Sequence, residues 1–229
     1  MIRIAIDGPS GAGKSTVSKA AAKELGYIYV DTGAMYRAAA LGCLCGQVDI
    51  RSDPKTAAEM VSLMQIDIKY GEDGTQHIFL DRENVTDYIR TPEVSLAASE
   101  ISKIPEVRRK LVDIQRKLGE THNVIMDGRD IGTYVFPNAE VKIFLTATPE
   151  ERARRRVAEL EAKGVDCTYD EVLSDMQYRD ENDSTREFAP LVPAEDSVQL
   201  VTDGLTFEES VQRVLEIIKE RLEKECSIN

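Results

Sequence analysis

The segment Gly8-Pro-Ser-Gly-Ala-Gly-Lys14-Ser15 lies between an apolar, β-branched run at residues 2–6 and a helical pattern from about Lys14 to Leu25. It fits the pattern G-x-x-x-x-G-K-[S/T] in the strand, loop and helix context that the pattern requires. The glycines let such a loop wrap anionic oxygens with successive backbone N–H groups, and the helix N-terminus adds its positive end. The segment therefore predicts a cradle for nucleotide phosphates.

Two side chains of this loop are expected to contact the nucleotide and its metal ion. Lys14 would reach the β- and γ-phosphates of ATP, and the Ser15 hydroxyl would help to hold the accompanying Mg²⁺. The alternative is a glycine-rich turn capped by Ser15, which leaves the lysine unexplained. We expect the whole loop to bind the nucleotide, namely Gly8, Pro9, Ser10, Gly11, Ala12, Gly13, Lys14, Ser15 and Thr16.

Outward from the loop, runs of strand length alternate with helical patterns. Apolar runs at 27–30, 123–126, 141–145 and 197–201 are typical of buried strands, and a helix is predicted from about Ala34 until Gly46 stops it. This alternation predicts an α/β fold, a P-loop NTPase-type three-layer sandwich with a central, mainly parallel sheet. Ligands of such sheets bind at the carboxyl ends of the strands.

Two further patterns complete the elements. In the middle of the chain, alternating segments at 66–70 and 76–80 flank Glu72-Asp73-Gly74, which predicts an antiparallel hairpin, and helices are expected to begin at Pro92 and Pro105. Capping boxes predict three later helix starts, at Thr148 with Glu151, Thr168 with Glu171 and Thr206 with Glu209.

Charge and composition exclude some classes of function. The 229 residues carry 29 Lys and Arg against 41 Asp and Glu, a net charge of -12, which argues against an electrostatic grip on DNA or RNA. No apolar run approaches the roughly 18 residues of a membrane span. Four cysteines without C-x-x-C or zinc spacing, and Asp7 interrupting the N-terminal apolar run, favour a cytoplasmic protein that contacts neither membranes nor nucleic acid.

A phosphate-binding loop alone does not separate a kinase from a regulatory GTPase. No N-K-x-D segment that would read guanine is present. Two further motifs, Asp31-Thr-Gly-Ala-Met-Tyr-Arg37 and Asp127-Gly-Arg-Asp130, follow predicted strands, and a third, Arg179-Asp-x-x-Asp183-x-x-Arg186, is expected near the far side of the sheet. These polar segments predict a second, anion-binding subsite beside the loop.

Together with Ile131-Gly-Thr133, Val135-Phe-Pro137 and Ala189-Pro-Leu-Val-Pro193, these motifs resemble the bacterial cytidylate kinases over essentially the whole chain. The resemblance implies one domain, with a core of residues 1–46, 119–148 and 165–229, an enlarged monophosphate-binding insertion within 47–118 and a short helical lid at about 149–164. It implies a monomer.

The resemblance also implies an activity. A (d)CMP kinase transfers the γ-phosphate of ATP, with Mg²⁺, to the 5′-phosphate of CMP or dCMP and gives ADP and CDP or dCDP. Another P-loop small-molecule kinase, of the UMP or shikimate type, remains an alternative, and so does a regulatory GTPase.

The acceptor phosphate calls for planar, always-charged donors, and the resemblance assigns Arg37, Arg129 and Arg186 to it. The alternative for each arginine is a surface ion pair. Asp31, Thr32 and Tyr36 are also expected at the acceptor. Asp31 and Asp127 end neighbouring strands, where either orients the magnesium shell or the arginines, or caps a turn; Asp31 is the preferred functional residue.

Cytosine presents an amino donor beside two acceptors, so it calls for a carboxylate or hydroxyl at one end and a cation at the other. The resemblance assigns Asp130, Ser99 and Arg108 to the base, although Ser99 also fits a satisfied helix serine. It assigns Arg179 and Asp183 to the sugar, where the residue types alone equally allow an i,i+4 ion pair.

The helix after Thr148 carries arginines at i, i+3 and i+4 spacing, which places Arg152, Arg155 and Arg156 on one face. It is similar to the family's lid, whose closure brings basic groups over the phosphates and expels water. The alternative is a solvated helix face. The expected catalytic residues are Lys14, Arg129, Arg152, Arg155 and Arg186, and Arg156 is expected to bind the nucleotide.

Overall fold

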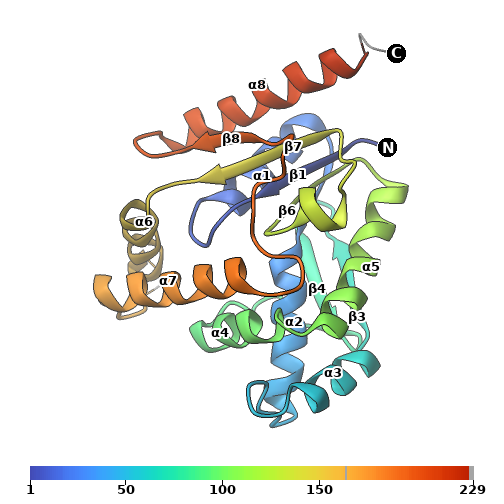
Figure 1. Ribbon diagram of the computed structural model, residues 1–229, viewed down its shortest axis with the longest axis vertical. Coiled ribbons are helices and arrows are strands. Elements are labelled where there is room, and N and C mark those ends of the chain that lie inside the picture. Colours follow the sequence, from blue (N-terminus) through green and yellow to red (C-terminus); the bar gives the residue numbers. More distant parts are fainter. Residues whose placement is uncertain (163, 227–229) are drawn as a thin grey trace.

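The computed structural model describes residues 1–162 and 164–226 (Figure 1). Its central sheet is parallel, as predicted, with the strand order β2-β6-β1-β7-β8. The strands are β1 (Arg3–Asp7), β2 (Ile28–Asp31), β6 (Val124–Gly128), β7 (Val141–Thr146) and β8 (Val198–Val201). Their near-continuous apolar sequences suit strands that are covered on both faces.

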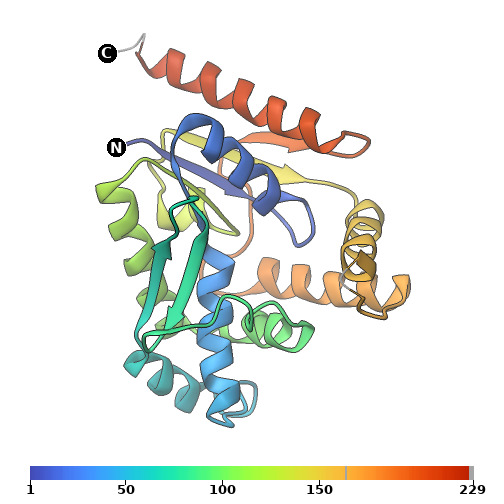
Figure 2. The same ribbon diagram turned by 180° about the vertical axis from the view of Figure 1, so that it is seen from behind.

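Alternate residues of β1 divide between two apolar layers, because successive side chains of a strand point to opposite faces. Ile4 and Ile6 pack with residues of α1 (Lys14–Leu25) and α8 (Phe207–Cys226). Ala5 packs with residues of α5 (Pro105–Thr121) and of η1 (Ile131–Val135), a short π-helical turn. Figure 2 views the molecule from the α1 side. The three-layer fold predicted from sequence is confirmed.

The inserted region has its own core, in which buried residues of α2 (Thr32–Cys45), α3 (Pro54–Leu63) and α4 (Pro92–Ile101) meet α5. An antiparallel sheet of β3 (Ile66–Tyr70), β4 (Gln76–Leu80) and β5 (Glu83–Asn84) packs against this core, which confirms the predicted hairpin. Helix α3 was not predicted. Its signal was available, because Asp53 accepts a hydrogen bond from Thr56 N and Pro54 holds the first turn.

Helices α6 (Pro149–Ala162) and α7 (Tyr169–Thr185) share a small apolar cluster of Ala153, Leu160, Val172 and Met176. The predicted capping boxes at Thr168 and Thr206 are present, each with both reciprocal hydrogen bonds.

The third predicted box, at Thr148, is wrong in one half. Its hydroxyl accepts from Glu151 N, but the backbone N–H of Thr148 donates to Asp203. The Glu151 carboxylate pairs instead with Arg154 and Arg155. A carboxylate from the neighbouring loop has taken the place of the local one.

Within the described residues, no helix is long and apolar enough to span a bilayer. Cys43, Cys45 and Cys167 are free thiols, and the side chain of Cys226 lies outside the described part of the chain.

Candidate active site

A cleft of about 1180 Å³ opens at the carboxyl ends of the parallel strands. The phosphate-binding loop forms one end, and the start of α2, the end of β6, and residues of α4, α5, α6, α7 and the start of α8 line the rest. Its walls carry a lysine and several arginines, namely Lys14, Arg37, Arg90, Arg108, Arg129, Arg155, Arg156, Arg179 and Arg186. In a chain of net charge -12, this is a local concentration of positive charge.

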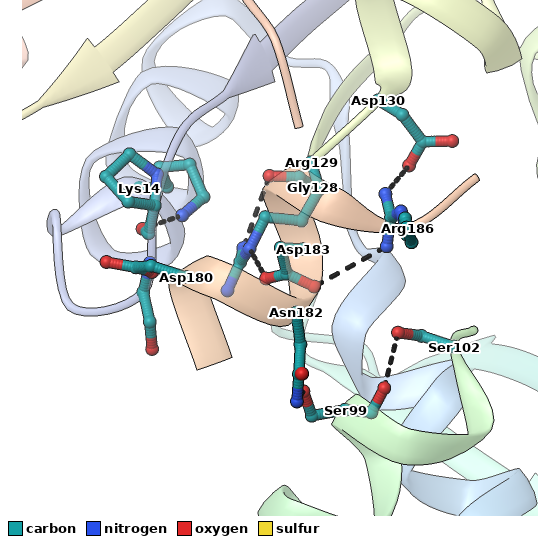
Figure 3. Close-up of polar contacts among 12 residues, drawn as sticks. Lys14, Ser99, Ser102, Gly128, Arg129, Asp130, Asp180, Asn182, Asp183 and Arg186 are labelled. Carbon is teal, nitrogen blue, oxygen red and sulfur yellow. Dashed lines mark hydrogen bonds and ion pairs between the residues drawn. The ribbon is translucent and has the colours of Figure 1, made fainter. Parts of the chain in front are cut away.

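The backbone of the phosphate-binding loop needs glycine at its first position. Gly8 has φ 149°, and a Cβ atom there would lie 1.9 Å from the carbonyl oxygen of Leu145. Lys14 is buried, and its Nζ donates a 2.6 Å hydrogen bond to the Pro9 carbonyl (Figure 3). Burial, and then the charge of Arg129, lower the pKa of Lys14 to about 7. Phosphate oxygens beside Nζ would favour its charged form.

The hydroxyl of Ser15 donates to Asp127 Oδ2 at 2.7 Å, and Tyr29 donates to the other carboxylate oxygen at 3.0 Å. Burial and the nearby Asp31 carboxylate raise the pKa of Asp127 to about 6. Mg²⁺ is bound through one or two protein oxygens, with water and phosphate oxygens completing its shell. The hydroxyl and carboxylate of this pair are donors of that kind, so the residues fit a magnesium ion brought by the nucleotide.

Asp31 and Asp127 are register partners at the ends of β2 and β6, as expected. Asp31 caps α2 by accepting from Ala34 N at 2.9 Å, and it lies 3.1 Å from Arg90 and 3.7 Å from Arg37. Asp31 therefore both caps a helix and orients arginines, whereas Asp127, the less favoured of the two from sequence, contacts the serine of the phosphate-binding loop.

Three cations crowd the middle of the cleft. Burial, and then the charge of Arg129, lower the pKa of Arg179 to about 10. Arg37 is half-buried, desolvation lowers its pKa, and its buried Nη1 donates no hydrogen bond among the described residues. A dianionic phosphate would supply the missing acceptor and relieve the mutual repulsion of these guanidinium groups. The middle of the cleft is therefore suited to a phosphate.

The far end of the cleft combines a carboxylate with two arginines. Asp130 forms a buried ion pair with Arg108. It also lies 3.4 Å from Arg186, as Figure 3 shows. The guanidinium of Arg108 stacks over the Tyr36 ring, 5.3 Å from its centroid. The structure thus brings together the residues that the sequence analysis assigned to a base.

Ser99 lines the same end of the cleft. Its hydroxyl oxygen accepts from Asn182 Nδ2 at 3.3 Å, and its carbonyl accepts from Ser102 Oγ at 2.8 Å. The hydroxyl therefore engages α7 across the cleft.

Asp183 shows how α7 contributes. Its carboxylate lies 2.7 Å from Arg129 Nε and 3.5 Å from Arg186 Nη1, so it pairs with these two arginines. Thr32 donates to the carbonyl of Asp127 at 2.7 Å and ties the start of α2 to the end of β6.

The arginines of α6 do not share one environment. Arg155 and Arg156 line the cleft, and Arg155 donates to the side chain and carbonyl of Thr202 at 3.0 and 2.7 Å. Arg152 is buried and pairs with Asp180. Arg154 is 64% exposed. Part of the basic face predicted for this helix is therefore interior.

The family model for cytidylate kinase matches residues 4–220. The chain belongs to the cytidylate kinase family. It is 55% identical to a cytidylate kinase of Caldicellulosiruptor bescii over 94% of this chain and 95% of the relative, and 50% identical to one of Clostridioides difficile over 93% and 95%. An uncharacterized protein from Eubacterium ventriosum has a similar fold, with a TM-score of 0.50 and 13% identity over 96% of this chain and 99% of that chain.

Membership of the cytidylate kinase family favours a kinase over a regulatory GTPase. Some residues of the cleft were not predicted from the sequence. Arg90, which pairs with Asp31, and Thr202, which binds Arg155, both line the cleft without having been predicted. Arg90 directly precedes the Thr91 N-cap, and its local sequence gave no signal that it lines the cleft. Thr202 had none either, since its contact crosses 47 residues of sequence.

Proposed function

We propose that the protein transfers the γ-phosphate of ATP, bound with Mg²⁺, to the 5′-phosphate of CMP or dCMP, giving ADP and CDP or dCDP. The observation that carries the proposal is the single cleft that joins the Lys14 cradle to the buried Asp130–Arg108 pair. Its ends are suited to phosphates and to a base with a donor beside acceptors, and the family is that of cytidylate kinases.

The transfer needs alignment and charge neutralisation more than covalent chemistry. Lys14 would hold the transferring phosphate, and Arg37 and Arg129 would hold the acceptor phosphate against it. Arg186, with Arg155 of the lid, would neutralise charge that develops on the transferring oxygens. Mg²⁺, held through Ser15 and the phosphates, would supply further neutralisation. Closure of α6 over the phosphates would exclude water and so suppress ATP hydrolysis.

Base selection would rest on Asp130. Its carboxylate has lone pairs left to accept from the N4 amino group of cytosine, and Arg108 and Ser99 would donate to the ring acceptors. Uracil would turn O4 toward the carboxylate, and a buried acceptor left unpaired costs about 1–3 kcal/mol. We expect CMP to be favoured over UMP by about ten- to a hundredfold.

Sugar recognition would come from Arg179 and Asp183 of α7. We expect these contacts to tolerate a missing 2′-hydroxyl, so that dCMP is also a substrate. We also expect the protein to act as a monomer in the cytoplasm.

The test is ADP formation from Mg·ATP with CMP, dCMP, UMP, AMP, GMP and shikimate offered singly at equal concentration. The proposal predicts strong turnover with CMP and dCMP, weak turnover with UMP and none with the others. Turnover with shikimate in place of CMP would support the alternative small-molecule kinase. Tight GTP binding without acceptor-dependent turnover would support the regulatory GTPase alternative.

A further inference from the structure

Asp180 lies in the Arg179-to-Arg186 motif, but the proposed function gives it no role. Its Oδ1 accepts a 3.0 Å hydrogen bond from the backbone N–H of Ser10, in the phosphate-binding loop. Its Oδ2 lies 2.5 Å from Arg152 Nη1. This carboxylate therefore connects α7 to the phosphate-binding loop and to α6.

Arg152 completes the connection. Its Nη1 also donates to the carbonyl of Ser10 at 2.8 Å, and its Nε donates to the Ala147 carbonyl at 3.0 Å. The side chains of Arg152 and Asp180 are 6% and 19% exposed, so water competes little for these bonds. Both backbone polar groups of Ser10 are thus held by one ion pair that is largely buried.

The packing beside this pair is equally close. A Cβ atom on Gly11 would lie 2.6 Å from the Met176 methyl group of α7 and 3.4 Å from Arg152 Cβ. The first turn of the loop is therefore pressed against α6 and α7, and a displacement of α7 would move it.

The same helix carries the residues proposed to bind the acceptor. Figure 3 shows Asp180 on the side of Lys14 and Asp183 beside Arg129, both on α7. Arg179 immediately precedes Asp180 and lines the cleft. A helix moves as a rigid unit. An acceptor that fixes Arg179 and Asp183 on α7 therefore also fixes the Asp180 carboxylate against the phosphate-binding loop.

We propose that Asp180 is a positioning residue, which holds Ser10 so that the loop amides face the ATP phosphates and which links acceptor binding on α7 to tighter ATP binding. The linkage rests on the proposed function, whereas the positioning of the loop does not. Coupling of binding free energies is reciprocal, so ATP must tighten the binding of the acceptor by the same factor.

The experiment titrates β,γ-imido-ATP with Mg²⁺ into the wild type and the variants by calorimetry, with and without CMP. Asp180→Ala is expected to weaken analogue binding about tenfold, because it removes a charge-assisted hydrogen bond, and to abolish the tightening by CMP. Affinity for CMP alone should change by less than about twofold. Glu181→Gln is the matched control, since it removes one charge from the neighbouring, exposed position of α7 and should change neither affinity.

Unchanged analogue affinity in Asp180→Ala, or an equal loss of CMP and analogue affinity together with a lower melting temperature, would overturn the proposal. Asp180→Asn keeps an acceptor for Ser10 N–H but loses the charge that faces Arg152, so it should show an intermediate loss. Asp180→Asn serves as the test if Asp180→Ala does not fold. A wild type that neither turns over CMP nor responds to it would refute both the proposed function and the linkage. The affinity of Asp180→Ala for the analogue would still show whether Asp180 positions the phosphate-binding loop.

Discussion

Arg108 and Asp130 form an ion pair with side chains only 1% and 7% exposed. The pair spans two elements, because Arg108 comes from the first turn of α5 and Asp130 follows β6. Burying two charges is costly unless hydrogen bonds satisfy them, and Arg108 Nε has no partner among the described residues. An arrangement that is poor for stability alone is well suited to a ligand that brings its own donors and acceptors.

Asp130→Asn tests this reading. The amide would present a donor to O4 of uracil and would accept less strongly from the amino group of cytosine. We expect kcat/KM for CMP to fall about a hundredfold and the preference for CMP over UMP to fall at least about tenfold. Steady-state kinetics with both acceptors measures this.

The control is Asp113→Asn, which removes a charge from an exposed position of α5 and should change kcat/KM for neither CMP nor UMP. Asp130→Asn also leaves Arg108 and Arg186 less compensated, so we expect a loss of stability of about 3–5 kcal/mol, and assays belong well below the melting temperature. A variant with the wild-type ratio of CMP to UMP turnover would contradict this account of base selection.

Lys14 predicts that ATP binding depends on pH. With its pKa lowered to about 7 in the free protein, the lysine is charged below pH 7 and increasingly neutral above it. Phosphates bind the charged form, so above pH 7 binding takes up a proton and affinity falls as the pH rises, by at most about tenfold per pH unit.

Calorimetry between pH 7 and 9, in buffers with different ionisation enthalpies, measures the proton uptake directly. This range lies above the pKa of about 6 of Asp127. Asp7 also interacts with Lys14, and burial raises its pKa to about 7, so Asp7 titrates at the lower end of the range in both proteins. Lys14→Arg stays charged throughout and should take up no proton, whatever its affinity. Equal proton uptake in the two proteins would assign the effect to another group.

Features fixed by local sequence were predictable. The first helix runs from Lys14 to Leu25 with Gly26 in the left-handed conformation at φ 67°, and the hairpin strands have the predicted bounds. These elements depend on neighbours a few residues apart, such as the absence of a Cβ at Gly26. The position of Arg129 at the cleft was also predictable, because it follows β6 and parallel strands place their carboxyl ends at one edge.

Features fixed by distant partners were not predictable. Arg152 looks like its neighbours on a basic helix face, and only the approach of Asp180 and Ser10 makes it interior. The half-wrong capping box at Thr148 has the same origin, since Asp203 arrives from another part of the chain. Spacing along a helix shows which side chains share a face, but not which other parts of the protein pack against that face.

Lys110 predicts a purely structural effect in the inserted region. Its Nζ donates to the carbonyls of Val61, Ser62 and Met64, at 2.8, 2.8 and 2.5 Å, where α3 ends. The last carbonyls of a helix have no partner within it, and a cation there also complements the helix dipole. Lys110→Met should destabilise the protein by about 1.5–3 kcal/mol in urea unfolding, with kcat for CMP unchanged.

Lys117→Met is the control, because Lys117 is an exposed residue two turns further along α5. Its unfolding midpoint should match that of the wild type. If Lys110→Met unfolds at the same urea concentration as this control, the three carbonyls gain nothing measurable from the lysine.

Arg155 predicts a separation of chemistry from binding. It lines the cleft, and its Nη1 would lie 3.9 Å from a Cβ on Gly13, beside the phosphate-binding loop. Arg155→Ala should lower kcat by about a hundredfold while the affinity for β,γ-imido-ATP falls much less, because the charge is needed most on the transferring oxygens. Arg154→Ala, on the exposed face of the same helix, should be near wild type. An Arg155→Ala enzyme of wild-type activity would remove the lid from the mechanism.

Arg37 gives the sharpest test of the acceptor phosphate site. Its guanidinium lies 3.7 Å from Asp31, yet its buried Nη1 makes no hydrogen bond among the described residues. Arg37→Lys keeps the charge but loses the planar fork, so KM for CMP should rise about tenfold or more. Arg37→Ala should lower kcat/KM for CMP about 10²–10³-fold, with KM for ATP changed by less than about twofold, since the nucleotide's phosphates bind to the loop. Arg109→Lys, at an exposed position on α5, controls for the substitution itself. An equal rise of KM for both substrates in Arg37→Lys would mean that this arginine supports the whole cleft and not the acceptor alone.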